Sequence, residues 1–127
     1  FVGWLPQDEL IHLYDEHSIF LFPSFYEGFG KVFLEAMARG MCVVASRTGG
    51  MRDVIRDGKN GFLVPPGDVD ETVARVKALA DDDGAQAAAM SRAARTTACS
   101  YSWERVASET LHFYEERIEA RRRGHDG

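Results

Sequence analysis

Two glutamates, Glu27 and Glu35, bracket a glycine-rich segment whose residue types suit the binding of phosphates and hydroxyl groups. Gly28-Phe29-Gly30 follows the first glutamate, and residues 31–39 are strong helix formers. The first amides of a helix have no intrahelical partner and carry partial positive charge, so a phosphate can dock there if glycines let it come close. A carboxylate accepts hydroxyl hydrogen bonds at charge-assisted strength. The segment therefore predicts a site for a phosphorylated, hydroxyl-rich ligand.

The polar residues of this helix allow two interpretations. Lys31 would stand at the helix N-terminus, where a cation is repelled by roughly 0.3–1 kcal/mol unless a negative group, such as a ligand phosphate, lies nearby. Alternatively, Lys31, Glu35 and Arg39 form an ion-paired stripe on a solvated edge, and Glu27 is a solvated loop carboxylate. Two glutamates around one glycine turn favour the ligand site. Because apolar residues cover most of the circumference, we expect the helix to be nearly all buried.

Short apolar runs mark the strands that would position this segment. Residues 19–22 form such a run, and residues 42–46 are β-branched and apolar, as in parallel strands covered on both faces. A third strand is expected over residues 62–64. Helices are expected over residues 7–16, 31–39, 51–56, 69–81, 84–98 and 103–123, with N-caps at Asp68 and Ser102. The alternation predicts an α/β fold with a parallel sheet, flanking helices and a long C-terminal helix.

A second glycine-bearing turn, Arg47-Thr48-Gly49-Gly50, follows the strand over residues 42–46. In parallel sheets such turns gather at the carboxyl ends of the strands, where ligands bind. The two glycines could instead serve only to permit a tight turn. The pattern leaves both interpretations open.

The composition is that of a single soluble globular domain, with 127 residues, 45% hydrophobic and 28% charged. A net charge of −5 argues against nucleic acid as a partner. Cys42 and Cys99 fit no metal or redox spacing, and the acidic run over residues 81–83 lacks the other ligands of a metal loop, so no metal or cofactor is expected. We find no signal peptide and no apolar run long enough to span a bilayer, which favours a cytoplasmic location.

The run Glu27-Gly-Phe-Gly-Lys-Val-Phe-Leu-Glu35 resembles the E-x7-E signature of retaining, nucleotide-sugar-dependent glycosyltransferases of family 4, also called group 1. The likeness continues in the same order over residues 43–50 and 57–68, and it covers roughly residues 1–118. It implies a Rossmann-like fold, with residues 1–127 as a single partial domain, the distal half of a GT-B C-terminal, donor-binding domain. The substitutions are mild, such as Cys42 where the family commonly has proline. The larger departure is upstream, because the arginine and lysine that clamp the diphosphate in the family come from the start of the C-terminal domain, which this chain does not include.

The resemblance also implies roles for individual residues. Glu27 would be the catalytic residue that hydrogen-bonds hydroxyls of the donor sugar, and Glu35 would bind the ribose hydroxyls of the nucleotide. The implied donor-binding residues are Gly28, Phe29, Gly30, Lys31, Val32, Glu35, Thr48 and Gly49. Two carboxylates in a retaining enzyme could indicate a covalent double displacement. The resemblance implies instead a same-face attack, with the leaving phosphate of the nucleotide-diphosphate sugar as the base and no metal.

Partners follow from the same resemblance. The acceptor, which could be a sugar, a lipid-linked molecule or a small molecule, would bind to an N-terminal domain missing from this chain, so the chain alone is expected to be inactive. The C-terminal helix would cross to that domain, which leaves aromatic surface exposed or paired with another chain. A truncated sheet has an unpaired edge, so self-association is expected.

Two further possibilities stay open. Three arginines at residues 121–123 could touch anionic lipid, which makes a peripheral position at the inner membrane face an alternative to a purely cytoplasmic one. The alternative function is a non-catalytic module that binds sugar nucleotides or phosphate. A non-transferase GT-B relative, such as a sugar-nucleotide epimerase, would lack this E-x7-E context.

Overall fold

Three short parallel strands form the centre of the fold in the computed structural model, which describes residues 2–81 and 83–123. The strands are β1 (Ile19–Phe22), β2 (Cys42–Ser46) and β3 (Phe62–Val64), in the order β1-β2-β3. β1 pairs with β2 from Ile19 opposite Cys42, and β3 pairs with the other edge of β2. Because all strands run the same way, their carboxyl ends share one edge of the sheet.

Helices precede and follow the strands at the positions predicted from the sequence. They are α1 (Gln7–Glu16), α2 (Lys31–Ala38), α3 (Met51–Val54), α4 (Val69–Ala80), α5 (Ala85–Cys99) and α6 (Trp103–Arg123). Asp68 and Ser102 cap α4 and α6 as predicted. The Asp68 carboxylate accepts a hydrogen bond from the Glu71 amide (2.9 Å), and the Ser102 hydroxyl accepts one from the Arg105 amide (3.2 Å). The predicted α/β fold with a long C-terminal helix is confirmed.

α3 is two residues shorter than the helix predicted over residues 51–56. Its C-cap residue, Ile55, has an extended backbone (φ −83°, ψ 123°) and is buried in the core. The buried Asn60 side chain accepts a hydrogen bond from the Arg56 amide (2.6 Å) and donates to the Val54 carbonyl (3.1 Å). It also donates to a threonine hydroxyl of α5 (2.9 Å). These bonds take the place of a further helical turn and tie the segment to α5.

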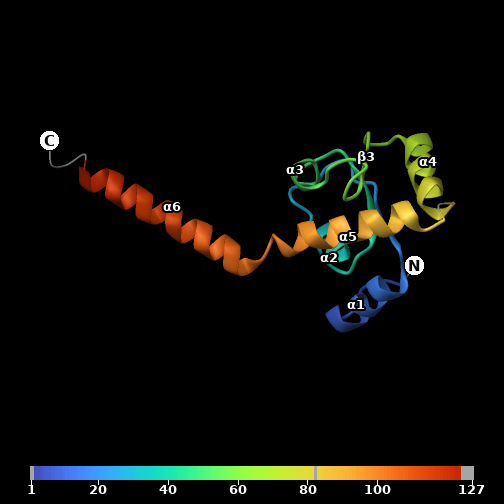
Figure 1. The fold of residues 1–127 in the computed structure, drawn as a ribbon, viewed down its shortest axis with the longest axis horizontal. Coiled ribbons are helices and arrows are strands. Elements are labelled where there is room, and N and C mark those ends of the chain that lie inside the picture. Colours follow the sequence, from blue (N-terminus) through green and yellow to red (C-terminus); the bar gives the residue numbers. More distant parts are fainter. Residues whose placement is uncertain (1, 82, 124–127) are drawn as a thin grey trace.

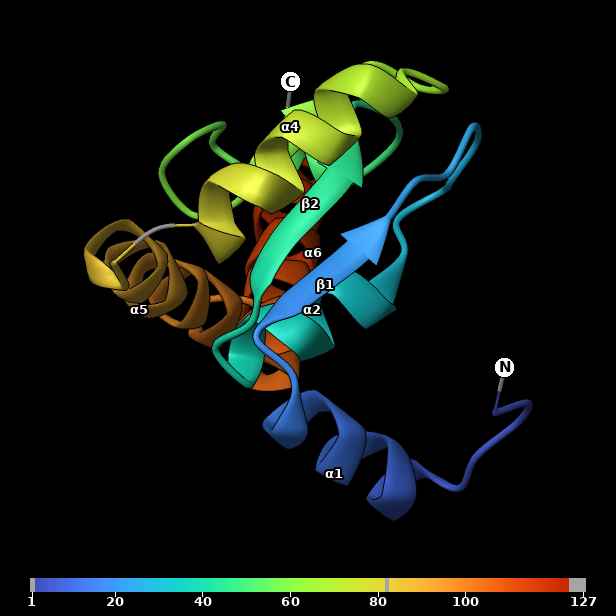
Figure 2. The ribbon, with the colours of Figure 1, turned by 90° about the vertical axis from the view of Figure 1, so that its right-hand side faces the viewer.

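Apolar side chains fill both sides of the sheet. Phe33 and Met37 of α2 are fully buried on one side, and Leu79 of α4 and Met90 of α5 pack on the other. All of β2 is buried, as predicted for a central parallel strand. Figure 2 shows α4 and α2 on opposite sides of the sheet. α2 is less buried than predicted, because only its side toward the sheet and α5 is covered and Ala38 lies on the exposed side.

The last helix, α6, extends away from the globular part of the chain (Figure 1). None of its residues is buried, and its aromatic side chains are exposed. This agrees with the expectation of exposed aromatic surface on the C-terminal helix. None of the helices in the described residues, α6 included, is long and apolar enough to cross a membrane.

Candidate functional site

The two glycine turns touch each other at the carboxyl edge of the sheet. The Gly50 amide donates a hydrogen bond to the Gly28 carbonyl (2.8 Å). Gly49 has a φ of +49°, and a Cβ on this residue would lie 1.9 Å from the carbonyl oxygen of Glu27. Such a distance is far inside van der Waals contact, so only glycine fits. The glycine pair at residues 49–50 therefore does more than permit a tight turn. It allows the turn that follows Glu27 to pack directly against the turn over residues 47–50.

The N-terminus of α2 is open. Its N-cap is Gly30, with a φ of +71° and no side chain that caps the helix. The Phe33 amide donates to the Gly30 carbonyl (3.2 Å), whereas we find no hydrogen bond from the Lys31 or Val32 amide to any described residue. Two amides at a helix start, with the partial positive charge of the helix behind them, form a place where an anion can bind.

Glu27 lies against this helix start. A Cβ on Gly30 would be 2.9 Å from the Glu27 Cγ, so the absence of a side chain at this position makes room for the glutamate. Glu27 is half-buried, and its Oε1 accepts a hydrogen bond from the Gly28 amide (3.0 Å). The carboxylate is thus held within its own turn, beside the open amides, rather than extended into solvent.

The ion-paired stripe considered for α2 does not form. Arg39 pairs instead with Asp15 of α1 through two hydrogen bonds, from Nε to Oδ1 (2.6 Å) and from Nη2 to Oδ2. The hydrogen bond from Arg39 and its charge lower the pKa of Asp15. Glu35 has no ion pair with any described residue, and it faces Tyr14, whose pKa is raised by burial and then by the Glu35 charge. The Glu35 carboxylate is exposed and available to a ligand.

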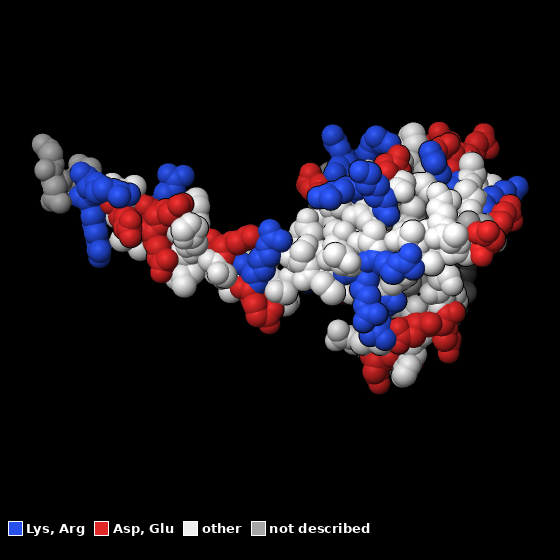
Figure 3. Space-filling model, in the orientation of Figure 1, with Lys and Arg blue, Asp and Glu red and all other residues white. Residues whose placement is uncertain are grey.

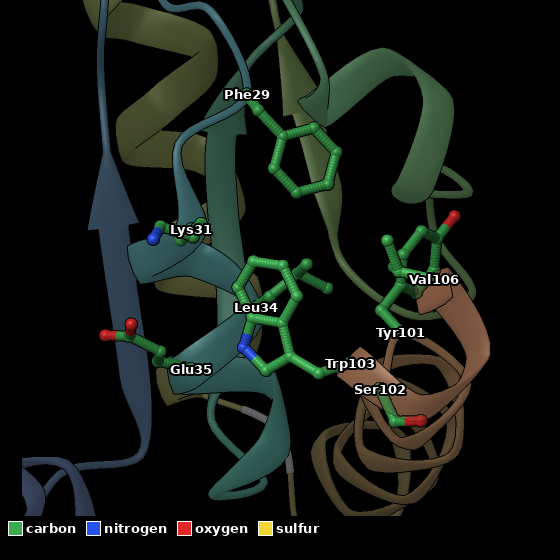
Figure 4. A pocket seen from close by; sticks show the side chains of 8 residues that line it. All are labelled: Phe29, Lys31, Leu34, Glu35, Tyr101, Ser102, Trp103 and Val106. Carbon is green, nitrogen blue, oxygen red and sulfur yellow. The ribbon is translucent and has the colours of Figure 1, made fainter. Parts of the chain in front are cut away.

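Glu35 also lines a pocket between α2 and the start of α6, with a volume of about 310 Å³ (Figure 4). Its lining residues are Phe29, Lys31, Leu34, Glu35, Tyr101, Ser102, Trp103 and Val106. Lys31 Nζ lies 6.0 Å from the centroid of the Trp103 ring. Figure 4 shows the Trp103 ring facing α2, from which Lys31 and Glu35 project. The pocket is thus lined by aromatic side chains together with one positive charge, on Lys31, and one negative charge, on Glu35.

Two buried hydroxyl groups near the end of β2 have no hydrogen-bond partner among the described residues. They are Ser46 Oγ, in the last residue of the strand, and Thr48 Oγ1, in the turn that follows. Leaving a buried hydroxyl unpaired costs about 1–3 kcal/mol. Such a cost is often accepted at functional sites, where a ligand or water supplies the missing partner.

The residues predicted for the site fall into two neighbouring groups. The first lies at the contact between the turns and the start of α2, and comprises Glu27, Gly28, Gly30, Val32, Thr48 and Gly49. The second lines the pocket, and comprises Phe29, Lys31 and Glu35. No group of three or more His, Cys, Asp or Glu among residues 2–81 and 83–123 is arranged to hold a metal ion. Of the acidic run over residues 81–83, Asp82 lies outside the described residues.

Sequence reasoning missed Ser46, Tyr101 and Trp103. The two aromatic residues are distant from the glycine turns in the sequence, and the bend between α5 and α6 brings them to α2. The available signal was the aromatic pair at residues 101–103, next to the predicted N-cap of the last helix. No pattern in the sequence placed that pair beside Lys31.

Comparison with known proteins places this geometry in a family. Residues 1–97 match the family described as glycosyl transferases group 1. The chain is 41% identical over 106 residues to the sulfoquinovosyl transferase SQD2 of Arabidopsis thaliana. This alignment covers 81% of the chain and 21% of the Arabidopsis protein.

Two solved structures are also similar. One is the C-terminal domain of a glycosyl transferase group 1 family protein from Francisella tularensis (TM-score 0.72, 26% identity, 80% of this chain and 52% of that chain). The other is HepE from Anabaena in complex with UDP (TM-score 0.69, 30% identity, 79% of this chain and 29% of that chain). The chain thus spans between about a fifth and a half of these relatives. The likenesses confirm the predicted family resemblance and the predicted fold class of a GT-B C-terminal domain.

Proposed function

The chain belongs to the group 1 glycosyl transferases, and from that premise we propose that it forms the donor-binding part of a retaining transferase that moves a hexosyl group from a nucleotide-diphosphate sugar to an acceptor. The observation that carries this proposal is the open start of α2 with the Glu27 carboxylate beside it, at the carboxyl edge of a parallel sheet. Residues 1–127 would act as a single partial domain.

In this proposal the donor diphosphate binds at the amides of Lys31 and Val32. Neither amide has a partner among the described residues, and the Lys31 ammonium adds positive charge nearby. As the glycosidic bond breaks, negative charge grows on the leaving phosphate. Fixed amide dipoles aimed at that charge stabilise the transition state without reorganisation. The similarity to HepE, which was solved with UDP, supports a nucleotide diphosphate as the ligand class.

The two glutamates have separate tasks in the proposal. Glu27 accepts hydrogen bonds from hydroxyls of the donor sugar and fixes its position over the helix start. Glu35, exposed and without an ion pair to any described residue, accepts the two ribose hydroxyls. Thr48 and Gly49, in the turn under Glu27, lie near the sugar and phosphates, and the buried Thr48 hydroxyl gains a partner there.

The reaction proceeds by attack of the acceptor on the face that the leaving phosphate departs from, and that phosphate takes the acceptor's proton. No covalent sugar intermediate on Glu27 is required. The acceptor site belongs to a preceding domain of a longer protein, and the cations that clamp the diphosphate belong to an upstream part of the donor-binding domain itself. We therefore expect the 127-residue chain to bind donor without transferring sugar. The chain aligns with only 21% of SQD2 and 29% of HepE, which agrees with this division.

Calorimetric titration of the chain with UDP, GDP and ADP tests the proposal. We expect saturable binding of one of them and a loss of about 10- to 100-fold in affinity for Glu35→Ala, since each lost charge-assisted hydrogen bond contributes roughly 1.5–3 kcal/mol. The control is Glu115→Ala, which removes an exposed carboxylate from α6. If Glu35→Ala binds the nucleotide as strongly as the parent chain, Glu35 does not bind the ribose hydroxyls. An absence of binding to all three nucleotides would show that this chain lacks a donor site.

A further inference from the structure

The aromatic ring of Phe29, in the turn before α2, packs against three other parts of the fold. A Cβ on Gly50 would lie 2.4 Å from the Phe29 Cδ2, so the ring rests directly on the backbone of the second glycine turn. The centroid of the buried Phe33 ring of α2 is 6.0 Å from that of Phe29. The Tyr101 ring, from the bend between α5 and α6, is 6.5 Å away by the same measure. Both distances are within the range of favourable aromatic pairs.

Tyr101 supplies the outer side of this packing. Gly50 and Phe33 are buried, whereas Phe29 is 42% exposed, so its buried neighbours do not enclose the ring. Figure 4 shows Phe29 projecting from the loop before α2 and Tyr101 projecting from the chain that enters α6, and both line the pocket between these helices. Without the Tyr101 ring, the Phe29 ring would be free to move outward into the pocket and to lift the turn away from Gly50.

Hydrogen bonds on both sides of the bend fix the backbone of Tyr101. Its amide donates to the carbonyl of Ala98 (3.0 Å), a buried residue of α5, and α5 packs against α2. From the other side, Arg105 of α6 donates from Nη1 to the Ser100 carbonyl (3.0 Å). These contacts lie at the end of α5 and in the first turn of α6. The position of Tyr101 is therefore set within the described chain and does not depend on what covers the rest of α6.

We propose that Tyr101 is a positioning residue of the donor site, because its ring holds Phe29 on Gly50. This packing keeps the turn before α2 in the conformation that leaves the first two amides of the helix open to a phosphate. The inference rests on the proposed function, and it gives Tyr101 a role without contact to the donor. It also makes the Phe29 side chain a support of the turn, in addition to a wall of the pocket.

The strength of one aromatic pair sets the size of the effect. Such a pair can shift the equilibrium between a held and a loosened turn by about 3- to 10-fold. The apparent dissociation constant of a ligand rises as the binding-competent fraction of the chain falls. We therefore expect Tyr101→Ala to weaken nucleotide binding by about 3- to 10-fold, less than the loss expected for Glu35→Ala, which removes a direct contact.

Hydrogen exchange of the Gly50 amide, followed by NMR without any nucleotide, measures the hold on the turn directly. This amide donates to the Gly28 carbonyl (2.8 Å), so it exchanges with water only when the two turns separate. We expect the exchange to be about 3- to 10-fold faster in Tyr101→Ala, relative to the amides of β2, which open with the whole sheet. A tyrosine that only touched a ligand would not change this rate. Calorimetric titration with whichever of UDP, GDP and ADP the parent chain binds gives the matching change in affinity.

Two further variants serve as controls. Tyr101→Phe keeps the ring and should match the parent chain in both the exchange rate and the affinity. Tyr114→Ala breaks another tyrosine–phenylalanine pair, with Phe113 at 6.2 Å, and should also match the parent chain. Figure 3 shows that the far part of α6, with its acidic and basic side chains, stands clear of the globular part of the chain. Tyr101 and Tyr114 are 43% and 58% exposed, so neither substitution threatens folding.

Three results would overturn the proposal. An unchanged exchange rate of the Gly50 amide in Tyr101→Ala would show that the ring does not hold the turn. An equal acceleration in Tyr114→Ala would show a general loosening of the chain. Faster exchange in Tyr101→Ala with unchanged nucleotide affinity would separate the hold on the turn from the donor site. A parent chain that binds no nucleotide would refute the proposed function, whereas the exchange rates would still decide whether Tyr101 holds the turn.

Discussion

The contact between the two glycine turns can be tested by adding a single methyl group. In Gly49→Ala, the new Cβ would lie 1.9 Å from the Glu27 oxygen and 2.5 Å from the Gly28 oxygen. Both atoms belong to the backbone, so no side chain can rotate away and one turn must move. A shift of about 1 Å or more would separate the Gly50 amide from the Gly28 carbonyl, whose hydrogen bond is 2.8 Å long.

The expected loss of stability has two parts. Alanine at the positive φ of Gly49, +49°, costs roughly 1–2 kcal/mol whatever the space around it. Breaking the hydrogen bond between the turns, and leaving the amide of the buried Gly50 unpaired, adds about 1–3 kcal/mol. We therefore expect Gly49→Ala to lower the free energy of unfolding by roughly 3 kcal/mol. A small domain has about 5–15 kcal/mol, so the variant should still fold.

The matched control is Gly58→Ala. Gly58 also has a positive φ, +73°, but a Cβ there meets nothing within 4 Å, so this variant carries only the conformational cost. Urea unfolding followed by circular dichroism gives both losses, and their difference isolates the contact between the turns. Equal losses, within about 0.5 kcal/mol, would refute the contact. Under the proposed function, Gly49→Ala should also weaken nucleotide binding by at least about tenfold, because displacing the turn at Gly28 shifts the start of α2, where the diphosphate binds, whereas Gly58→Ala should bind normally.

Two other predictions concern the framework of the site. Asn60→Ala removes three hydrogen bonds and leaves the buried Val54 carbonyl without its side-chain partner, so it should cost about 3 kcal/mol in urea unfolding; a cost below about 1 kcal/mol would contradict the role given to this side chain. Arg39 lowers the pKa of Asp15 in the folded state, so the stabilisation is present above the ordinary aspartate pKa and is lost as the pH falls through the lowered value. Asp15→Asn should therefore lower the melting temperature at pH 7 and have no effect in strong acid, and a difference independent of pH would contradict the pairing.

The strands could be predicted from sequence because their signals are local. β2 is a β-branched run bounded by glycine-bearing turns, and its bounds were predicted correctly. The end of α3 could not be predicted, since it depends on the Asn60 side chain, which competes for the backbone groups after Val54. A side chain that replaces a helical turn leaves no periodic pattern in the sequence.

The site likewise combines features that could be predicted from the sequence with features that depend on tertiary packing. The meeting of Gly28 and Gly50 follows from a general property of parallel sheets, whose carboxyl ends share one edge, and could be anticipated. The pairing of Arg39 with α1, rather than with Glu35 one turn away, depends on the angle between two helices. The position of Trp103 depends on the bend before α6. The crossing angles of helices and the bends between them are set by packing over the whole core. The spacing of residue types along the sequence does not encode that packing.

The contact between the turns also limits how this site can diversify. A side chain at Gly30 or Gly49 would collide with Glu27, so the backbone path around the helix start accepts almost no variation. In a library of variants designed to change the donor preference, most substitutions at these two positions would disrupt the turns. Such variants would be lost before any selection for binding. Variation is tolerated at Lys31 and at Trp103, because both side chains are exposed and line the pocket. New specificity should therefore come from the walls of the pocket, on an unchanged backbone.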